Sequence, residues 1–245
     1  MCQDEDDVPY HFDRVIQMLE KKIEEICFGA GGTRDPVLFL TGSENFRKQI
    51  AISKPYKGTR KSVKPYHFKN ITVYMENQYD VVLKEGLEAD DMMAVYQSHS
   101  ELDTIICTRD KDLRMVYGWH YGWECGNCRE FGPELVTPET EWLKLTRHGA
   151  KQTPKVTGTG LIFFYSQLIT GDTVDNIPGL PRQGAVAAYE LLTNPEDERP
   201  LWDRVVDLYE KKGFDEVYLK EQCDLLWMVQ ELTPEGEPVF WNPPS

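Results

Sequence analysis

Helical and strand patterns alternate through the first 110 residues of the chain. Residues 12–27 place apolar side chains at helical spacing, and a glycine-rich turn at residues 29–32 follows them. Short apolar runs at residues 36–40, 71–75 and 103–107 indicate strands, and residues 89–97 indicate a helix before the last of these strands. The alternation predicts the α/β class, with a mostly parallel sheet flanked by helices.

The second half of the chain has a different pattern. Glycine and proline residues between positions 117 and 138 predict turns and a hairpin, and residues 139–147 are expected to form a short helix. From Leu161 onward the pattern is helical, with a helix at residues 185–192 after a glycine-rich turn. We therefore expect an α/β domain over residues 1–157 and a helical domain over residues 158–245.

Three acidic motifs lie at the expected ends of helices and strands. They are Glu88-Ala-Asp-Asp91, Thr108-Arg-Asp-Lys-Asp112 and Gly171-Asp-Thr-Val-Asp-Asn-Ile-Pro-Gly179. The first begins a helix, the second follows a strand, and the third lies in a turn before a helix, which are positions suited to ligand binding. Each motif also has a structural explanation: helix capping for the first, a surface turn for the second, and a calcium loop or plain interhelical turn for the third.

Carboxylates gathered in one place repel one another, and a site for hard divalent cations is the usual reason for such a cluster. Two Mg²⁺ or Mn²⁺ ions roughly 3.5–4 Å apart activate a water molecule and stabilise the leaving oxygen in phosphoryl transfer. The sequence contains no Ser-His-Asp arrangement or Walker-type loop that competes with this chemistry. The motifs therefore indicate a metal-dependent nuclease, with a metal phosphohydrolase for small molecules as an alternative.

Charged residues are distributed unevenly along the chain. The formal net charge of −14 by itself disfavours a phosphate-rich partner. Residues 45–75, however, contain eight Lys or Arg residues and no Asp or Glu. This basic segment is either a surface for nucleic acid or an ordinary solvated surface.

The six cysteines do not predict a disulfide framework, because only Cys125 and Cys128 are closely spaced in a chain of this length. With His120 and His148 as completing ligands, these two cysteines would form a zinc site, which is an alternative explanation of their spacing. No apolar run approaches the ~20 residues of a membrane span, and the acidic start differs from a signal peptide. A cytoplasmic location is therefore expected.

The three acidic motifs, in this order and spacing, resemble those of the 5′ nucleases. This family includes flap endonucleases, the 5′-nuclease domain of bacterial DNA polymerase I and phage 5′→3′ exonucleases, and we expect the phage-type enzymes to be the most similar. Asn45-Phe-Arg-Lys48 and Tyr56-Lys-Gly-Thr-Arg60 are similar to the family's segment between its second strand and its helical arch. The resemblance covers roughly residues 37–192.

The resemblance implies a PIN-like α/β core, a basic helical arch at residues 45–69 and a helix-three-turn-helix unit at residues 172–192. It implies that Lys57 and Arg60 act on the scissile phosphate or the strand end, and that K⁺ binds the helix-three-turn-helix unit. The implied ligands of the first metal ion are Glu88, Asp90, Asp110 and Asp112 with Asp91 in support, and those of the second are Asp172 and Asp175. The implied DNA-binding residues are Lys54, Lys57, Arg60, Lys61, Lys64, Gly179 and Gly184.

The implied activity is that of a Mg²⁺- or Mn²⁺-dependent 5′→3′ exonuclease and structure-specific flap endonuclease, acting in replication, recombination or repair. The implied partner is DNA with 5′ ends, flaps or single-strand/duplex junctions, with RNA of RNA–DNA hybrids as a further candidate. A monomer in a bacterial or phage-infected cell, without membrane attachment, is expected.

Two departures from the family pattern leave an alternative open. Family members begin with a strand that ends in a metal-ligand Asp before the first helix, whereas no such strand precedes residues 12–27 here. The Asp expected after the second strand is also missing, because that strand ends in Leu40-Thr-Gly42 and Glu44 is the nearest carboxylate. The alternative is an amino-terminally shortened member that binds DNA with weakened or lost catalysis.

Overall fold

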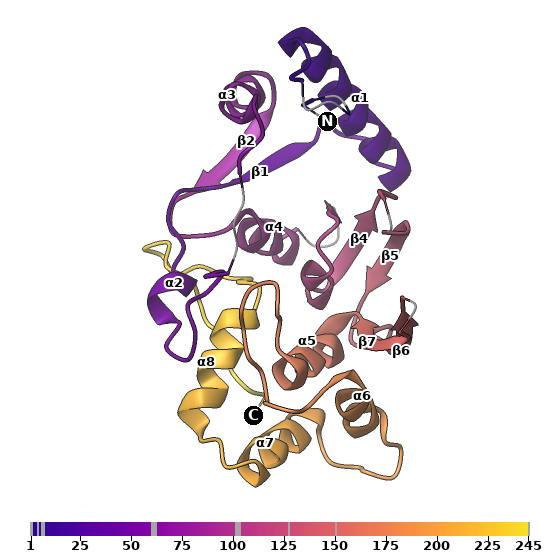
Figure 1. Cartoon of the computed structure of the whole chain (residues 1–245), viewed down its shortest axis with the longest axis vertical. Coiled ribbons are helices and arrows are strands. Elements are labelled where there is room, and N and C mark those ends of the chain that lie inside the picture. Colours follow the sequence, from indigo (N-terminus) through magenta and orange to yellow (C-terminus); the bar gives the residue numbers. More distant parts are fainter. Residues whose placement is uncertain are drawn as a thin grey trace.

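The computed structural model describes residues 2, 3, 5, 8–59, 63–100, 104–126, 128–149 and 151–244. Figure 1 shows an upper part built from helices and short strands and a lower part built from helices. The predicted α/β class is confirmed. None of the helices within the described ranges is long and apolar enough to cross a membrane.

The elements expected in the first 110 residues are present with one exception. Helix α1 spans Phe12–Ala30 and ends at Gly31, whose positive φ of 70° lets its N–H reach the last carbonyls of the helix. Strand β1 (Val37–Thr41) pairs in parallel with β2 (Asp80–Lys84), and α4 (Ala89–Ser98) follows β2 and packs on both. Strand β3 spans Ile105–Cys107.

The exception is the strand expected at residues 71–75, and that prediction is wrong. These residues lie within helix α3 (Phe68–Gln78), which follows the short helix α2 (Arg47–Ile50) along the chain. The β-branched residues there suggested a strand, but the place beside β1 is filled by β2. Tertiary pairing overrides local β-propensity in such a case.

The middle of the chain forms short, mostly antiparallel pairs. After the 3₁₀ turn η1 (Asp112–Met115), strand β4 (Gly118–Gly122) pairs in parallel with β3 and antiparallel with β5 (Phe131–Val136), so the expected hairpin is confirmed. Strands β6 (Leu143–His148) and β7 (Thr153–Gly158) form a separate antiparallel pair, and the short helix expected at residues 139–147 is therefore wrong. Within the described ranges the strands form three small sheets, and a single mostly parallel sheet is not confirmed.

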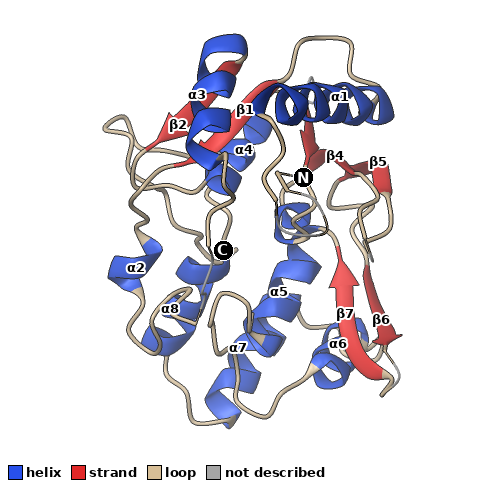
Figure 2. Cartoon of the chain, turned by 45° about the horizontal axis from the view of Figure 1, so that its top comes forward, coloured by secondary structure: helices blue, strands red, loops and turns tan. Residues whose placement is uncertain are grey.

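The lower part consists of α5 (Gly160–Thr170), α6 (Ala185–Thr193), α7 (Leu201–Lys211) and α8 (Glu216–Leu226), as the helical pattern predicted. Helix α5 is apolar on nearly all sides and lies among the other helices, as Figure 2 shows. Its Phe163, Phe164 and Leu168 are buried in the same core as Leu113 and Met115 of η1. Because this core includes residues from both sides of position 157, the expected division there stays a prediction.

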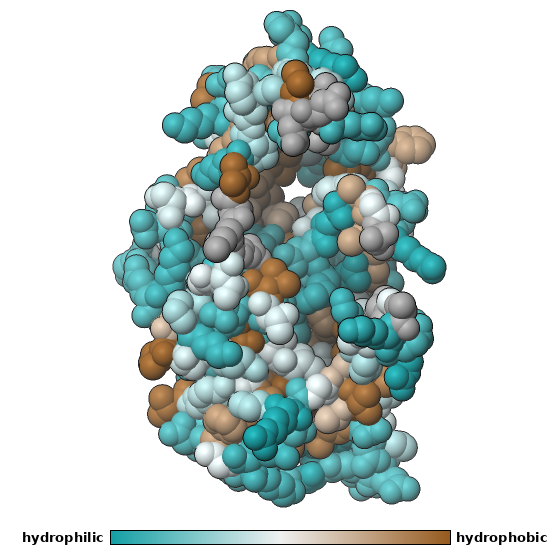
Figure 3. Space-filling view, viewed as in Figure 1, coloured by the Kyte–Doolittle hydropathy of each residue, from teal (hydrophilic) through white to brown (hydrophobic). Residues whose placement is uncertain are grey.

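The face in Figure 3 is dominated by hydrophilic residues, with hydrophobic side chains in separate small groups. It is hollowed between the part that carries α1 and α3 and the helical part below. The residues of the acidic motifs lie between these two parts, on α4, after β3 and after α5.

Candidate active site

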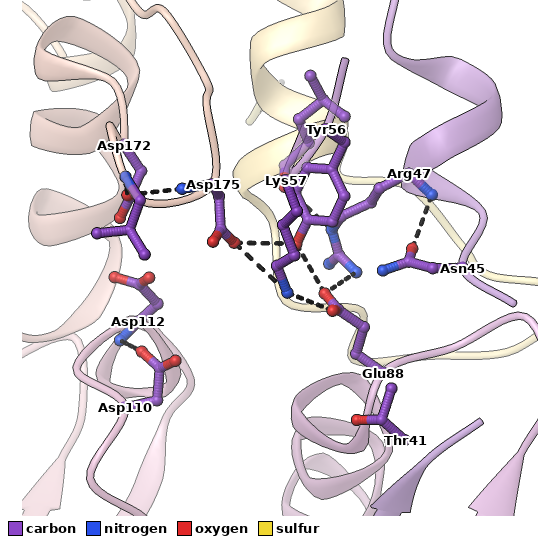
Figure 4. A network of polar contacts seen from close by, with 12 residues as sticks. Thr41, Asn45, Arg47, Tyr56, Lys57, Glu88, Asp110, Asp112, Asp172 and Asp175 are labelled. Atoms are coloured by element: carbon purple, nitrogen blue, oxygen red, sulfur yellow. Dashed lines mark hydrogen bonds and ion pairs between the residues drawn. The ribbon is translucent and has the colours of Figure 1, made fainter. Parts of the chain in front are cut away.

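Glu88 lies at the amino end of α4, where it is fixed from several sides. Its carboxylate accepts a hydrogen bond from the hydroxyl of Tyr56 at 2.7 Å and forms an ion pair with Lys57 (Figure 4). A capping box with Asp91 fixes the first turn of the helix. Burial raises the pKa of Glu88, but the charges of Lys57 and Arg47 outweigh burial and hold this pKa below its ordinary value. Glu88 is therefore a charged carboxylate in a defined position.

Asp91 has a different environment from the one implied by the resemblance. Both of its carboxylate oxygens accept hydrogen bonds from the guanidinium of Arg47 at 2.7 Å, and both side chains are fully buried. The same oxygens accept the backbone N–H groups of Glu88 and Val229, each at 3.1 Å. Asp91 is thus committed to Arg47 and supports the position of Glu88; the structure offers it no free oxygen for a metal ion.

Asp110 and Asp112 follow the carboxyl end of β3, as expected. Asp110 accepts the backbone N–H of Asp112 at 2.9 Å, so the two residues form a tight turn. Asp112 also accepts hydrogen bonds from Gln167 of α5 at 2.5 Å and from the ammonium of Lys111 at 2.7 Å. The turn after β3 is therefore attached directly to the central helix of the lower part.

Asp172 and Asp175 belong to a compact loop between α5 and α6, which we call the 171–179 loop. Asp172 Oδ1 accepts the backbone N–H groups of Val174 and Asp175, at 2.7 and 3.2 Å, and Asp172 pairs with Ile177 across the loop. The loop closes where the backbones of Gly171 and Gly179 touch, with φ values of 67° and 57°. Only glycine fits this crossing, because a Cβ on Gly179 would lie 2.3 Å from the nitrogen of Gly171.

Lys57 joins the basic segment to the 171–179 loop. Its backbone N–H donates to the carbonyl of Asp175 at 2.9 Å, and its ammonium lies 3.7 Å from the Asp175 carboxylate as well as against Glu88. The neighbouring Tyr56 hydroxyl bonds both of these carboxylates, and Asn176 donates to the carbonyl of Pro55. The structure thus brings Lys57, expected to act on the strand end, next to carboxylates from two of the three acidic motifs.

The remaining acidic residue, Asp90, connects the motifs electrostatically. Burial and the nearby charges of Asp110 and Glu88 raise the pKa of Asp90 to about 7. Burial likewise raises the pKa of Asp112, with Asp110 and Asp172 adding to the effect against Lys111. Carboxylates from all three motifs are therefore close enough to repel one another, and hard oxygen donors under mutual repulsion are the donor set that fits a divalent cation.

The carboxylates do not, however, form a preformed metal cage. In the part of the chain that the structure describes, no three carboxylate, histidine or cysteine side chains converge closely enough to hold a metal ion. The ammonium groups of Lys57 and Lys111 lie between them instead. Lys57 therefore links the first motif to the third, and Lys111 links the second motif to the third.

The residues of the expected DNA-binding set lie in different surroundings. Arg60 and Lys61 lie outside the described residues. Lys54 and Lys64 are exposed, and the ammonium of Lys64 lies 4.3 Å from the ring centre of Phe68. Gly184 is the N-cap residue of α6 and has open space beside it, whereas Gly179 is buried at the loop crossing.

Among the side chains that the structure describes, none completes a zinc site with Cys125 and Cys128. The two cysteines face each other across a tight turn, with backbone N–H to carbonyl bonds of 3.0 and 3.1 Å in both directions. His120 is buried on β4 and uses its Nε2 to donate to the carbonyl of Val116 at 2.7 Å. The side chain of His148 lies outside the described part of the structure.

Sequence reasoning missed several residues that shape the site. Tyr56, Lys111 and Gln167 each contact an acidic candidate. Nothing in their residue types predicted these contacts; only their closeness to a motif in the sequence pointed to them. Thr41 ends β1, and its hydroxyl accepts the backbone N–H of Ala89 at 3.1 Å. An uncharged side chain therefore stands at the end of this strand, where the resemblance leads one to expect an aspartate.

The arrangement defines an α/β protein with a lysine-bridged acidic site between a strand-containing part and a helical part. Among solved structures, it is similar to the flap endonuclease of bacteriophage T5 in a pseudo-enzyme-product complex with DNA and metal ions. The TM-score is 0.52 at 13% sequence identity, and the match covers 84% of this chain and 78% of that chain. A T5 5′-exonuclease structure with bound zinc ions covers 86% of this chain and 90% of its own, at 14% identity and a TM-score of 0.48.

Comparison of the sequence with known proteins finds a related DNA polymerase. A DNA polymerase I of Rhizobium leguminosarum is 28% identical over 214 residues, which amount to 82% of this chain. The chain spans only 19% of the length of that polymerase. No family model matches the chain. The resemblance to the 5′ nucleases that the acidic motifs indicated is thereby confirmed, with a 5′ nuclease of bacteriophage T5 among the structural neighbours and a DNA polymerase I among the sequence relatives.

Proposed function

We propose that this chain is a divalent-metal-dependent 5′ nuclease that cuts DNA at 5′ ends, flaps and single-strand/duplex junctions. The proposal is supported above all by the meeting of three acidic motifs with Lys57 on one face (Figure 4), in a fold similar to that of the bacteriophage T5 flap endonuclease. A basic side chain beside several carboxylates suits a phosphodiester, because metal ions held by the carboxylates and the lysine ammonium would attract the same phosphate from two sides.

The donor set suits Mg²⁺ or Mn²⁺, which prefer carboxylate oxygens. Glu88, Asp90, Asp110 and Asp112 would hold a first ion, and Asp172 and Asp175 a second. Bound there, the two ions would supply an activated water and stabilise the leaving oxygen. Asp91 contributes indirectly, since it fixes Glu88 through the capping box.

The remaining residues would bind and orient the DNA. Lys57, with Arg60 from the same segment, would contact the scissile phosphate, and Lys54, Lys61 and Lys64 would extend the contact along the strand. The 171–179 loop and the amino end of α6 at Gly184 would contact the duplex backbone through N–H groups, with K⁺ bound at the loop, as in a helix-three-turn-helix unit. Such binding is insensitive to base sequence and falls with salt, because each neutralised phosphate releases counterions.

A second candidate function is DNA binding by a related module with weak or no catalysis. Thr41 favours it, because this position at the end of β1 brings no carboxylate to the site. A site that lacks ligands of one ion would still retain the loop and the basic segment that bind DNA. The two candidates differ in catalysis but not in the expected DNA structure.

A 5′-labelled flap substrate separates them. The wild-type chain should cut it with Mg²⁺ or Mn²⁺ and bind without cutting in Ca²⁺. Asp110→Asn and Asp172→Asn should abolish cutting and leave flap binding in Ca²⁺ unchanged or tighter, since each removes a negative charge near phosphate. Asp203→Asn, an exposed residue of α7, is the matched control and should cut normally.

Undiminished cutting by both Asp110→Asn and Asp172→Asn would contradict the metal site as assigned. Binding of the flap by the wild-type chain, without cutting in any of the three ions, would instead identify the non-catalytic module. Equal affinity for plain single strands and for flaps would contradict the proposed duplex contact by the loop and α6.

A further inference from the structure

Two lysines occupy equivalent positions in the acidic site. The ammonium of Lys57 bridges Glu88 at the start of α4 and Asp175 of the 171–179 loop, as Figure 4 shows. The ammonium of Lys111 bridges Asp112 after β3, at 2.7 Å, and Asp172 of the same loop, at 3.4 Å. Each lysine therefore joins one carboxylate of the strand-containing part to one carboxylate of the loop, and we call these contacts the two lysine bridges.

The carboxylates that the lysines join are fixed without them. Asp172 accepts two N–H groups of its own loop, Asp112 accepts the amide of Gln167, and the Tyr56 hydroxyl contacts both Glu88 and Asp175. They are also largely buried, since the exposed fractions of these four side chains lie between 11% and 19%. Four such carboxylates in one place require positive charge between them.

The lysine side chains are the movable part of the arrangement. The Lys111 side chain is 49% exposed and reaches the site from a surface turn, and that of Lys57 is 21% exposed. A lysine is a compact charge on a flexible four-carbon stem, so its ammonium can leave a carboxylate while its backbone stays in place. The Lys57 backbone does stay in place, because it adopts a positive φ of 53° and donates to the Asp175 carbonyl.

We propose that Lys57 and Lys111 are tethered cations that occupy the carboxylate gaps of the metal-free chain and are displaced by divalent ions. This inference rests on the proposed function, because it assumes that the same carboxylates bind those ions. In the metal-free chain the lysine bridges hold the 171–179 loop against α4 and the turn after β3. Binding of metal replaces the ammonium groups and frees both lysines beside the place where a phosphate would bind.

Metal affinity and metal-free stability test the proposal without any measurement of cleavage. Lys57→Met and Lys111→Met keep the apolar stem and remove the charge. Each should bind Mn²⁺ about fivefold more tightly than wild type in calorimetry. The ammonium no longer competes with the metal, and an ion pair that stays in contact with solvent is worth about this factor. Each should also unfold at a lower temperature without metal and gain more from added Mn²⁺.

Two further variants serve as controls. Lys111→Arg retains a cation and should keep the wild-type Mn²⁺ affinity within about twofold. Lys220→Met removes a lysine that pairs with Asp224 one helical turn away on α8, and it should change neither affinity nor the Mn²⁺-dependent stabilisation. If Lys57→Met does not fold, Lys111→Met alone carries the comparison.

Lysine reactivity in the wild-type chain provides a direct second measurement. Reductive methylation followed by mass spectrometry should label Lys57 and Lys111 slowly without metal and faster with saturating Mg²⁺. The rate at which Lys220 is labelled should not depend on the metal. Unchanged labelling together with unchanged Mn²⁺ affinity in the Met variants overturns the tethered-cation proposal alone. A wild-type chain that binds no Mn²⁺ overturns the proposed metal site and this inference with it.

Discussion

Loss of Asp91 should destabilise the fold more than loss of any other acidic candidate. Asp91 and Arg47 are both fully buried, and two hydrogen bonds of 2.7 Å join them. Arg47 also donates to the carbonyls of Leu225 and Trp227, at 3.0 and 2.6 Å. The pair therefore joins α2, α4 and the carboxyl end of α8 with the residues after it, three regions far apart along the chain.

The magnitude follows from the burial of both charges. Burial by itself lowers the pKa of Arg47, but the Asp91 carboxylate and its hydrogen bonds outweigh burial, so this pKa is raised and the guanidinium stays charged. Asp91→Ala would leave that buried charge with Glu88, 3.6 Å away, as its remaining carboxylate partner and without its two short hydrogen bonds. Removing one partner of a buried pair costs about 3–5 kcal/mol of the unfolding free energy. The carbonyls of Leu225 and Trp227 compensate only partly, because they carry no net charge.

Urea denaturation of four proteins measures this effect: wild type, Asp91→Ala, Arg47→Met and the double variant. The double variant should lose less stability than the sum of the single losses, because it leaves no buried charge unpaired. Asp224→Ala, which breaks the exposed pair with Lys220, is the control and should cost less than about 1 kcal/mol. A loss below about 1 kcal/mol for Asp91→Ala, or strictly additive losses, would refute the reasoning.

Three further predictions concern the loop, a buried histidine and the basic segment. Gly179→Ala should cost about 3 kcal/mol in thermal unfolding, because its Cβ would meet the Gly171 backbone at a positive φ, whereas Gly184→Ala has open space and should cost under about 0.5 kcal/mol. Burial lowers the pKa of His120 to about 4, so protonation of this side chain favours the unfolded chain. The unfolding free energy should therefore fall by up to about 3 kcal/mol as the pH drops from 6.5 to 4. In urea denaturation, His120→Gln should remove this part of the pH dependence. Lys57→Ala should lower the single-turnover rate of flap cutting about 100-fold while flap affinity in Ca²⁺ changes far less, and a wild-type rate would exclude a role at the phosphate.

Local sequence signals were sufficient to predict the positions of several helices. The amino end of α4 was recognisable because a capping residue and an acidic first turn lie within four positions of each other. Residues 71–75 show where such signals fail, since their β-branched side chains indicated a strand in what is helix α3. Strand β6 was missed although Leu143 and Leu145 alternate with Lys144 and Thr146, which is the strand period.

The acidic candidates were recognisable from the sequence, but their partners were not. Glu88, Asp110 and Asp172 stand in compact motifs, whereas Arg47 meets Asp91 across 44 positions and Tyr56 meets Asp175 across 119. No local pattern encodes contacts at such separations. For this reason the sequence grouped Asp91 with the metal ligands and Arg47 with the basic segment, although the two neutralise each other in the core.

The 171–179 loop connects stability and the proposed function more directly than any other segment. Its carbonyl and N–H at Gly179 bond the side chains of Tyr218 and Gln222 on α8, at 2.8 and 3.0 Å. Its other side carries the two aspartates that the lysine bridges join to the strand-containing part. A change on α8 that shifts the loop must therefore also move these carboxylates, whereas loss of a lysine leaves the α8 contacts intact. Gln222→Ala should accordingly weaken both the fold and Mn²⁺ binding, while Lys111→Met should weaken the metal-free fold and tighten Mn²⁺ binding, and this difference in sign distinguishes damage to the loop from removal of a competing cation.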